Sequence, residues 1–160
     1  MTQRINAVTV AADGIAALRG VEKYIQQSGL DRKLVVLVQI RVSQINGCAY
    51  CLHMHTEDAL ALGESDIRLY LLDAWHESNL YSRRERAALA WAESLTNIAA
   101  THAPDDVYEE ARRHFSEREL VDLSLTIAAI NAWNRLAISF RAQPGQYRPT
   151  THPRAEIAHG

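Results

Sequence analysis

Two cysteines and a histidine lie at spacings that suit thiol chemistry. Cys48 and Cys51 are three positions apart, and His55 follows Cys51 by four positions. On a helix, residues three or four apart share a face. The two thiols could therefore close a disulfide, and His55 could pass a proton to or from Cys51. His53 is only two positions beyond Cys51 and would point to another face.

The residues before the first cysteine favour a reactive thiolate. Asn46-Gly47 is a turn dipeptide, and it places Cys48 at or near the start of a helix. Free backbone N–H groups and the helix dipole at that end stabilise an anion. They lower the pKa of a thiol there, and the thiolate is the nucleophile.

Two other interpretations of the cysteines stay open. Buried cysteines often act as small apolar side chains, so the pair could be an inert part of the core. Cys48, Cys51 and His55 are also legitimate zinc ligands, because paired cysteines at this spacing are common in zinc sites. A structural zinc site needs a fourth ligand, and the other histidines considered are isolated in the sequence: His76, His102 and His114.

The composition predicts an ordinary globular protein. The chain has 160 residues, 48% of them apolar, which suits one compact domain with its own core. A net charge of −2 gives no electrostatic argument for binding nucleic acid or an anionic membrane surface. No uninterrupted apolar run reaches the ~18 residues of a membrane span. We also find no signal peptide, and only two cysteines occur. We therefore expect a cytoplasmic protein.

Helical periodicity dominates the chain, and no strand pattern flanked by hairpin turns occurs. We predict an all-α domain of about six to seven helices over residues 1–140. Ser82 with Glu85, and Ser116 with Glu119, form capping-box patterns that predict helix starts. The expected helices cover residues 13–27, 31–46, 48–62, 64–76, 82–95, 104–115 and 116–140. The second of these is apolar nearly all round, which predicts a central helix.

The last twenty residues form a separate segment. Residues 141–160 contain Pro144, Pro149 and Pro153, and their composition predicts an extended tail. A neighbouring subunit is a plausible partner to hold such a tail.

The cysteine segment resembles the alkylhydroperoxidase D-like family, part of the carboxymuconolactone decarboxylase superfamily. The similarity centres on residues 43–51, Ser-Gln-Ile-Asn-Gly-Cys-Ala-Tyr-Cys, followed by His-Met-His-Thr at 53–56. It continues weakly through Trp75 and through residues 85–91, and it returns at residues 130–135. Together these segments extend over residues 13–140.

The resemblance implies an all-α fold, a homo-oligomer (often a trimer or hexamer) and a thiol peroxidase cycle. In that cycle Cys51 attacks the hydroperoxide, Cys48 resolves the sulfenic acid into a disulfide, and His55 belongs to the proton relay. A lipoyl- or thioredoxin-like dithiol then restores the thiols. Such a cycle fits the chemistry expected of these residues, and we expect no cofactor and no metal.

Two positions depart from the pattern of the characterised peroxidase. That enzyme has a glutamate twelve positions before the first cysteine, where this chain has Val36. It also has a histidine just before the second cysteine, where this chain has Tyr50. Another carboxylate could complete the relay. Glu85 is one candidate, although a role as a helix cap is favoured for it. Glu93 is a second candidate, although a solvated side chain or an ion pair with a neighbour is favoured for it.

A group of polar residues interrupts the last apolar helix. Asn131, Trp133, Asn134 and Arg135 could bind an anionic substrate through the arginine, but a buried polar network or a subunit contact is favoured.

The function predicted first is therefore reduction of hydroperoxides through a Cys48–Cys51 dithiol/disulfide cycle. The alternatives are a disulfide reductase or redox sensor of the same fold, and an oligomeric binding protein without turnover. The decarboxylase branch of the superfamily generally lacks the paired cysteines, which argues against lactone decarboxylation.

Overall fold

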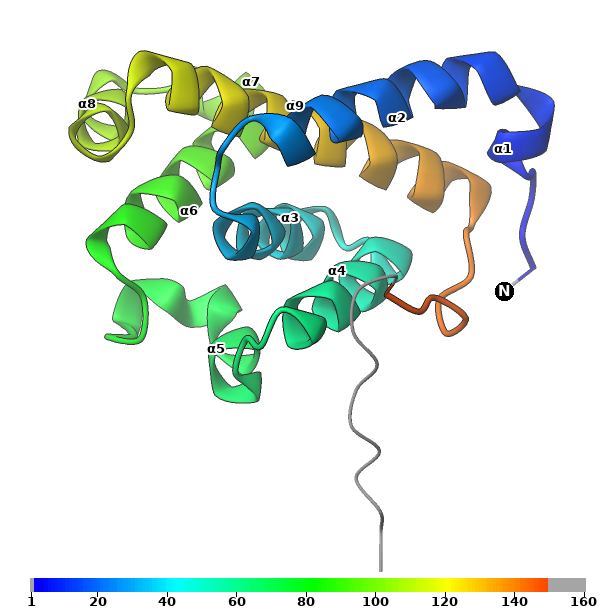
Figure 1. The fold of residues 1–160 in the computed structure, drawn as a ribbon, viewed down its shortest axis with the longest axis horizontal. Helices are drawn as coiled ribbons and strands as arrows, with labels where there is room; N and C mark the ends of the chain where they lie inside the picture. Colours follow the sequence, from blue (N-terminus) through cyan, green and yellow to red (C-terminus); the bar gives the residue numbers. More distant parts are fainter. Residues whose placement is uncertain (1, 150–160) are drawn as a thin grey trace, which may run out of the picture.

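The computed structural model describes residues 2–149, and all regular structure in that range is helical (Figure 1). This confirms the predicted all-α fold. The segments are α1 (Ala7–Val10), α2 (Ala12–Gln27), α3 (Arg32–Asn46), α4 (Ala49–Ala61), α5 (Asp66–Tyr70), the 3₁₀ helix η1 (Leu72–Glu77), α6 (Arg83–Thr96), α7 (Ile98–Thr101), α8 (Asp105–His114) and α9 (Glu117–Phe140).

The number of helices differs from the prediction of about six to seven, because ten segments lie in the described range. α1 and α7 are single turns of four residues, too short to produce a periodic apolar pattern. The helix expected over residues 64–76 is divided into α5 and η1, which also contains the non-helical residue Ala74. The longer helices begin and end within about two residues of the predicted bounds.

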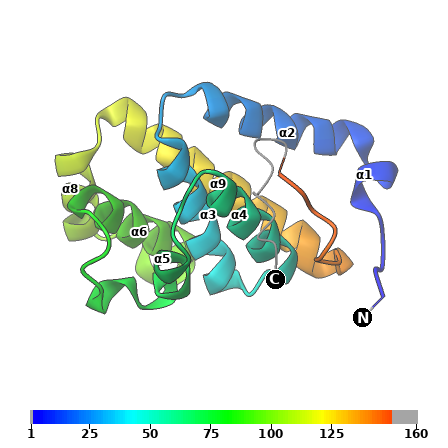
Figure 2. The same ribbon diagram turned by 60° about the horizontal axis from the view of Figure 1, so that its bottom comes forward.

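α3 lies at the centre of the molecule, as its apolar sequence predicted. It packs against α4, α6 and α9, and Figure 1 shows it enclosed by them and by α2. Leu37, Val38 and Val42 of α3 are at most 1% exposed. α2 runs beside α9 in both views (Figures 1 and 2). Within residues 2–149, no helix has both the length and the apolar character that a membrane crossing requires.

Both predicted capping boxes form. The Ser82 hydroxyl accepts a hydrogen bond from the Glu85 backbone N–H, and the Glu85 carboxylate accepts one from the Ser82 N–H. Ser116 and Glu119 make the same exchange at the start of α9. These bonds satisfy N–H groups that the first turn of a helix leaves unpaired.

The first part of the tail returns over α4 of the same chain (Figure 2). The Tyr147 hydroxyl donates a 2.6 Å hydrogen bond to Asp58, and the Gly145 N–H donates to His53 Nδ1 at 3.4 Å. Contacts within one chain therefore hold residues 145–147, where we had considered a neighbouring subunit. Residues 150–160, including Pro153, lie outside the described residues.

Candidate active site

A single glycine ends α3 and brings the first cysteine to the start of α4. Gly47 has a φ of +68°, in the left-handed region that glycine adopts at low cost. Cys48 is then the N-cap residue of α4, and its sulfur accepts a hydrogen bond from the Cys51 backbone N–H at 3.4 Å. The predicted placement of Cys48 at a helix start is confirmed.

The two thiols form one hydrogen-bonded pair. The Sγ atoms of Cys48 and Cys51 are 2.7 Å apart with no disulfide bond between them, and both residues are 1% exposed. The hydrogen bond with Cys51 lowers the pKa of Cys48 to about 7 against the effect of burial. The same hydrogen bond, together with burial, raises the pKa of Cys51. The first of the two thiol protons is therefore lost readily and the second is retained. The retained proton lies in the hydrogen bond between the two sulfurs.

Only one of the two cysteines faces the large cavity. This cavity has a volume of about 700 Å³ and lies between α2, α4, α9 and the segments at both ends of the described chain. Cys51 and the neighbouring Tyr50 line it, and Cys48 does not. Much of the remaining wall is apolar: Ile5, Val8, Ile15, Met54, Leu136 and Phe140. A ligand in this cavity therefore meets Cys51, with Cys48 behind it.

His55 lies on the wall of the same cavity and is 7% exposed. Its Nδ1 atom is 3.4 Å from Asp58 Oδ2, but among the described residues it has no well-aligned hydrogen-bond partner. Burial would raise the pKa of Asp58, yet the contact with His55 and the hydrogen bond from Tyr147 outweigh it and lower that pKa. His55 therefore faces a carboxylate that is held in its ionised form.

A second carboxylate approaches His55 from α2. Glu22 lines the large cavity and a smaller one of about 80 Å³, and His55 and Asp58 line both. Trp133 Nε1 donates a 3.1 Å hydrogen bond to the Glu22 carboxylate. Burial raises the pKa of Glu22, although the nearby His55 acts in the opposite direction.

Sequence reasoning missed both carboxylates beside His55. Asp58 is three positions after His55 and would share its helix face, so a local signal for it existed. Glu22 is on another helix, and no spacing connects it to the cysteines.

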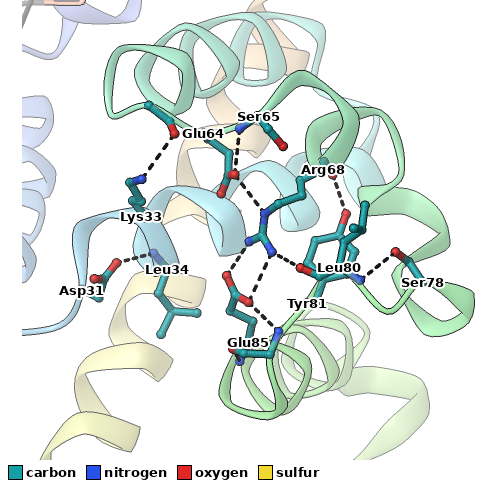
Figure 3. Close-up of polar contacts among 12 residues, drawn as sticks. Asp31, Lys33, Leu34, Glu64, Ser65, Arg68, Ser78, Leu80, Tyr81 and Glu85 are labelled. Carbon is teal, nitrogen blue, oxygen red and sulfur yellow. Dashed lines mark hydrogen bonds and ion pairs between the residues drawn. The ribbon is translucent and has the colours of Figure 1, made fainter.

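Glu85, one of the two carboxylates considered from the sequence, belongs to a different cluster. Figure 3 shows Arg68 between the carboxylates of Glu64 and Glu85, with ion-pair distances of 2.9 Å and 2.5 Å. Burial opposes ionisation of Glu85, but hydrogen bonds from Arg68 and from Ser82, where Glu85 closes the capping box, lower its pKa. Glu85 is therefore a capping and ion-pairing residue, the interpretation favoured from the sequence.

Glu93, the other carboxylate considered, is also paired elsewhere. It accepts hydrogen bonds from Arg41 Nε at 2.9 Å and from Trp75 Nε1 at 2.7 Å. Neither Glu93 nor Glu85 lines the cavities beside His55. The carboxylates that do are Glu22 and Asp58.

The polar residues of α9 form the buried network that was favoured over an anion site. Asn134 is fully buried and Asn131 is 9% exposed, and Asn46 hydrogen-bonds to both at 2.8 and 2.9 Å. Arg135 donates to Asn131, so its guanidinium is part of this network.

The geometry does not assemble a metal site from the cysteines and His55. Within residues 2–149, no group of three or more His, Cys, Asp or Glu side chains is arranged to hold a metal ion.

Comparison with known proteins places these features in a family. Residues 10–94 match the model of the carboxymuconolactone decarboxylase family. The uncharacterized protein YdfG of Bacillus subtilis is 44% identical over 139 residues, which are 87% of this chain and 95% of YdfG.

Solved structures support the same placement. One is a protein of unknown function from Agrobacterium tumefaciens, named as a candidate AhpD antioxidant defence protein. It superposes on this chain with a TM-score of 0.88 and is 40% identical in sequence. The match covers 91% of this chain and all of that one. The AhpD core of a peroxidase-related protein from Ralstonia eutropha shares the fold, with a TM-score of 0.76 at 19% sequence identity. That match covers 88% of this chain and 75% of the Ralstonia chain. The chain belongs to the carboxymuconolactone decarboxylase family, in its alkylhydroperoxidase D-like branch.

Proposed function

We propose that this protein is a thiol peroxidase that reduces organic hydroperoxides through a Cys48–Cys51 dithiol/disulfide cycle. One observation carries the proposal: Cys51 lines a cavity of about 700 Å³, and the Cys48 sulfur lies 2.7 Å behind it. A thiol that meets the substrate and a second thiol within reach of the first are the two groups that such a cycle needs. The fold and the named relatives agree with a peroxidase-related function.

The cycle begins with a proton transfer inside the pair. In the singly protonated pair, the proton moves across 2.7 Å from Cys51 to Cys48 and leaves a thiolate on Cys51. That thiolate attacks the outer oxygen of the hydroperoxide, the O–O bond breaks, and the products are a sulfenic acid on Cys51 and an alkoxide. The alkoxide takes a proton and leaves as the alcohol.

The second step closes the disulfide. The Cys48 thiol attacks the Cys51 sulfur, its proton joins the departing hydroxide, and water is released. One hydroperoxide and two thiols thus give one alcohol, one water and one disulfide. An external dithiol, lipoyl- or thioredoxin-like, then supplies two electrons and two protons by thiol–disulfide exchange.

His55 is the proton carrier in this scheme. It lies one helical turn after Cys51 and lines the same cavity, so it can protonate the alkoxide and recover the proton later. Asp58, held ionised 3.4 Å from His55 Nδ1, and Glu22, which lines the same cavities, stabilise the charged imidazole. These two carboxylates take the role for which Glu85 and Glu93 had been considered.

The proposal includes a cytoplasmic homo-oligomer, a trimer or hexamer. Light scattering should give a mass several times that of the 17.9 kDa chain. A monomer at micromolar concentration would rule out this part of the proposal without affecting the thiol cycle.

Mass spectrometry with differential thiol labelling tests the cycle. The reduced protein receives one equivalent of cumene hydroperoxide, and thiols are alkylated before and after the pulse. We expect both cysteines to become unreactive, with a Cys48–Cys51 disulfide in the peptide map and an equal amount of cumyl alcohol. Two thiols that stay reactive, in a protein whose circular dichroism confirms folding, would exclude the peroxidase. A disulfide that forms only with an oxidised dithiol would instead indicate a disulfide reductase or sensor.

A further inference from the structure

The segment that follows α9 returns to the active site of its own chain. α9 ends at Arg141, whose φ of +55° is in the left-handed region, and the Ala142 N–H donates a 2.9 Å hydrogen bond to the Ala137 carbonyl oxygen. Gly145 has a φ of +108°, a conformation that glycine adopts at little steric cost. These two bends direct residues 142–147 back over α4 (Figure 2).

Two hydrogen bonds join this segment to α4, one before and one after His55 in the sequence. The Gly145 N–H donates to His53 Nδ1 at 3.4 Å, and the Tyr147 hydroxyl donates to Asp58 Oδ1 at 2.6 Å. Tyr147 also lines the large cavity. The segment therefore brings a hydroxyl group to the carboxylate that faces the histidine.

The chemistry of the two groups fixes the direction of the Tyr147–Asp58 bond. An ionised carboxylate can only accept, so the tyrosine hydroxyl is the donor, and such charge-assisted bonds are short and strong. Burial, and then the hydrogen bond with Asp58, raise the pKa of Tyr147, so that it keeps its proton at neutral pH. With Oδ1 of Asp58 occupied in this way, the other oxygen, Oδ2, faces His55 Nδ1 at 3.4 Å.

The orientation of this carboxylate matters for the histidine ring. His55 Nδ1 is buried and has no well-aligned hydrogen bond within residues 2–149, so Asp58 Oδ2 is the charge that it faces. A carboxylate beside one ring nitrogen favours the tautomer that carries the proton there, which leaves Nε2 as the acceptor that a proton carrier needs. The Asp58 side chain is 23% exposed. Without a donor to Oδ1 it is free to turn toward water.

Charged groups on other helices also face this pair. Glu22 of α2 and Arg32, the first residue of α3, line the small cavity together with His55 and Asp58. Arg19 of α2 lines the large cavity. Removal of the Tyr147 hydroxyl changes none of these charges, so its effect can be separated from theirs.

We propose that Tyr147 is a positioning residue, whose hydroxyl holds the Asp58 carboxylate turned toward His55, so that the segment after α9 completes the proton relay of the active site. The use of this relay in catalysis rests on the proposed dithiol cycle. The orientation of Asp58 does not, and it can be measured in the absence of peroxide.

NMR spectroscopy of Tyr147→Phe tests the orientation directly, because phenylalanine keeps the ring and removes only the hydroxyl. The pKa of Asp58 is read from the ¹³C shift of its carboxyl group, and the tautomer of His55 from the ¹⁵N shifts of its ring. We expect the pKa of Asp58 to rise by about one pH unit as the donor is lost, and the fraction of the Nδ1–H tautomer to fall. Tyr70→Phe, at a side chain that is 77% exposed, should change neither.

Stopped-flow measurement of disulfide formation with cumene hydroperoxide tests the role in catalysis. Tyr147→Phe should slow the reaction about threefold or more. In an Asp58→Ala protein, which is itself slower, the same substitution should cause no further loss, because the hydroxyl then has no carboxylate to hold.

Gly145→Val provides a second way to displace the segment. A β-branched residue rarely adopts a positive φ, and Gly145 lines neither cavity. We expect this variant to change the Asp58 pKa, the His55 tautomer and the rate in the same directions as Tyr147→Phe. If Tyr147→Phe does not fold, Gly145→Val decides.

A hydroxyl that only fastens the segment to α4 predicts other results. The inference would be overturned if folded Tyr147→Phe kept the wild-type Asp58 pKa and His55 tautomer, or if Tyr147→Phe slowed the reaction equally with and without Asp58. Failure of the proposed function is a separate result. Wild-type thiols that ignore cumene hydroperoxide would exclude the peroxidase, while the NMR measurements would still report whether Tyr147 orients Asp58.

Discussion

Glu22 and Val36 line one cavity of about 80 Å³, although the first is on α2 and the second on α3. His55 lines the cavity with them. Val36 occupies the position where the characterised peroxidase of the family has its glutamate, and here a neighbouring helix brings a carboxylate to the same small space. In the proposed cycle, Glu22 of α2 would supply the carboxylate that the family resemblance expects at position 36.

Replacing Glu22 by glutamine should slow oxidation of the thiols and change the pH dependence of stability. The first effect, a loss of at least about tenfold in disulfide formation with cumene hydroperoxide, follows because His55 loses a charged partner. For stability, the raised pKa of Glu22 means that the folded state holds this proton more tightly than the unfolded state. The wild type therefore loses stability as the pH rises through the folded pKa.

Urea denaturation of this pair of proteins at several pH values checks the sign. Glu22→Gln should match or exceed the wild type near pH 7 and lose that advantage below the unfolded pKa of about 4.5. Glu85→Gln is the matched control: its capping and ion-pair contacts predict lower stability with an unchanged oxidation rate in the folded protein. An equal loss of rate in both variants would contradict the assignment of Glu22.

A carboxylate restored at position 36 should compensate for the one lost from α2. We expect Glu22→Gln/Val36→Glu to oxidise faster than Glu22→Gln alone, because both side chains line the cavity next to His55. Stopped-flow measurement of disulfide formation gives the two rates. Val36→Gln in the Glu22→Gln protein is the control. Glutamine has nearly the volume of glutamate without its charge, so this variant should not restore the oxidation rate. Equal rates for all three folded proteins would show that a carboxylate at position 36 does not replace that of Glu22.

Substitution of the two cysteines should give different products. Cys51→Ser should abolish reduction of cumene hydroperoxide, because the thiol that faces the cavity is gone. Cys48→Ser should still be oxidised once, and its sulfenic acid should persist or over-oxidise, because no neighbouring thiol can resolve it. Dimedone trapping with mass spectrometry distinguishes these products. A dimedone adduct on Cys48 in the Cys51→Ser protein would reverse the assigned roles.

The pH dependence of alkylation should reveal the paired thiols. The pKa of Cys48 is lowered to about 7, so its alkylation rate should rise as the pH increases through about 7, below the value near 8.5 of a free thiol. In Cys51→Ala the pKa of Cys48 should increase, because the hydrogen bond with Cys51 is the largest cause of the shift. An unchanged midpoint in that variant would mean that the helix start alone activates Cys48.

The sequence by itself determined the features that depend on neighbours along the chain. The capping boxes at Ser82 and Ser116, and the Asn46-Gly47 turn, predicted where helices begin and end, because caps and turns are decided within a few residues. The shared face of Cys48 and Cys51 follows from the same local geometry.

Only the tertiary structure decided which side chains meet at the cavity. Glu22 lines the same cavities as His55 because α2 packs along α9, where Trp133 donates a hydrogen bond to its carboxylate. Tyr147 reaches Asp58 because the chain turns back over α4. Helical periodicity shows which face of a helix is buried but does not identify the helix that covers it. Contacts between distant segments depend on the packing of the whole core, so no spacing in the sequence could have assigned Glu22 to the site.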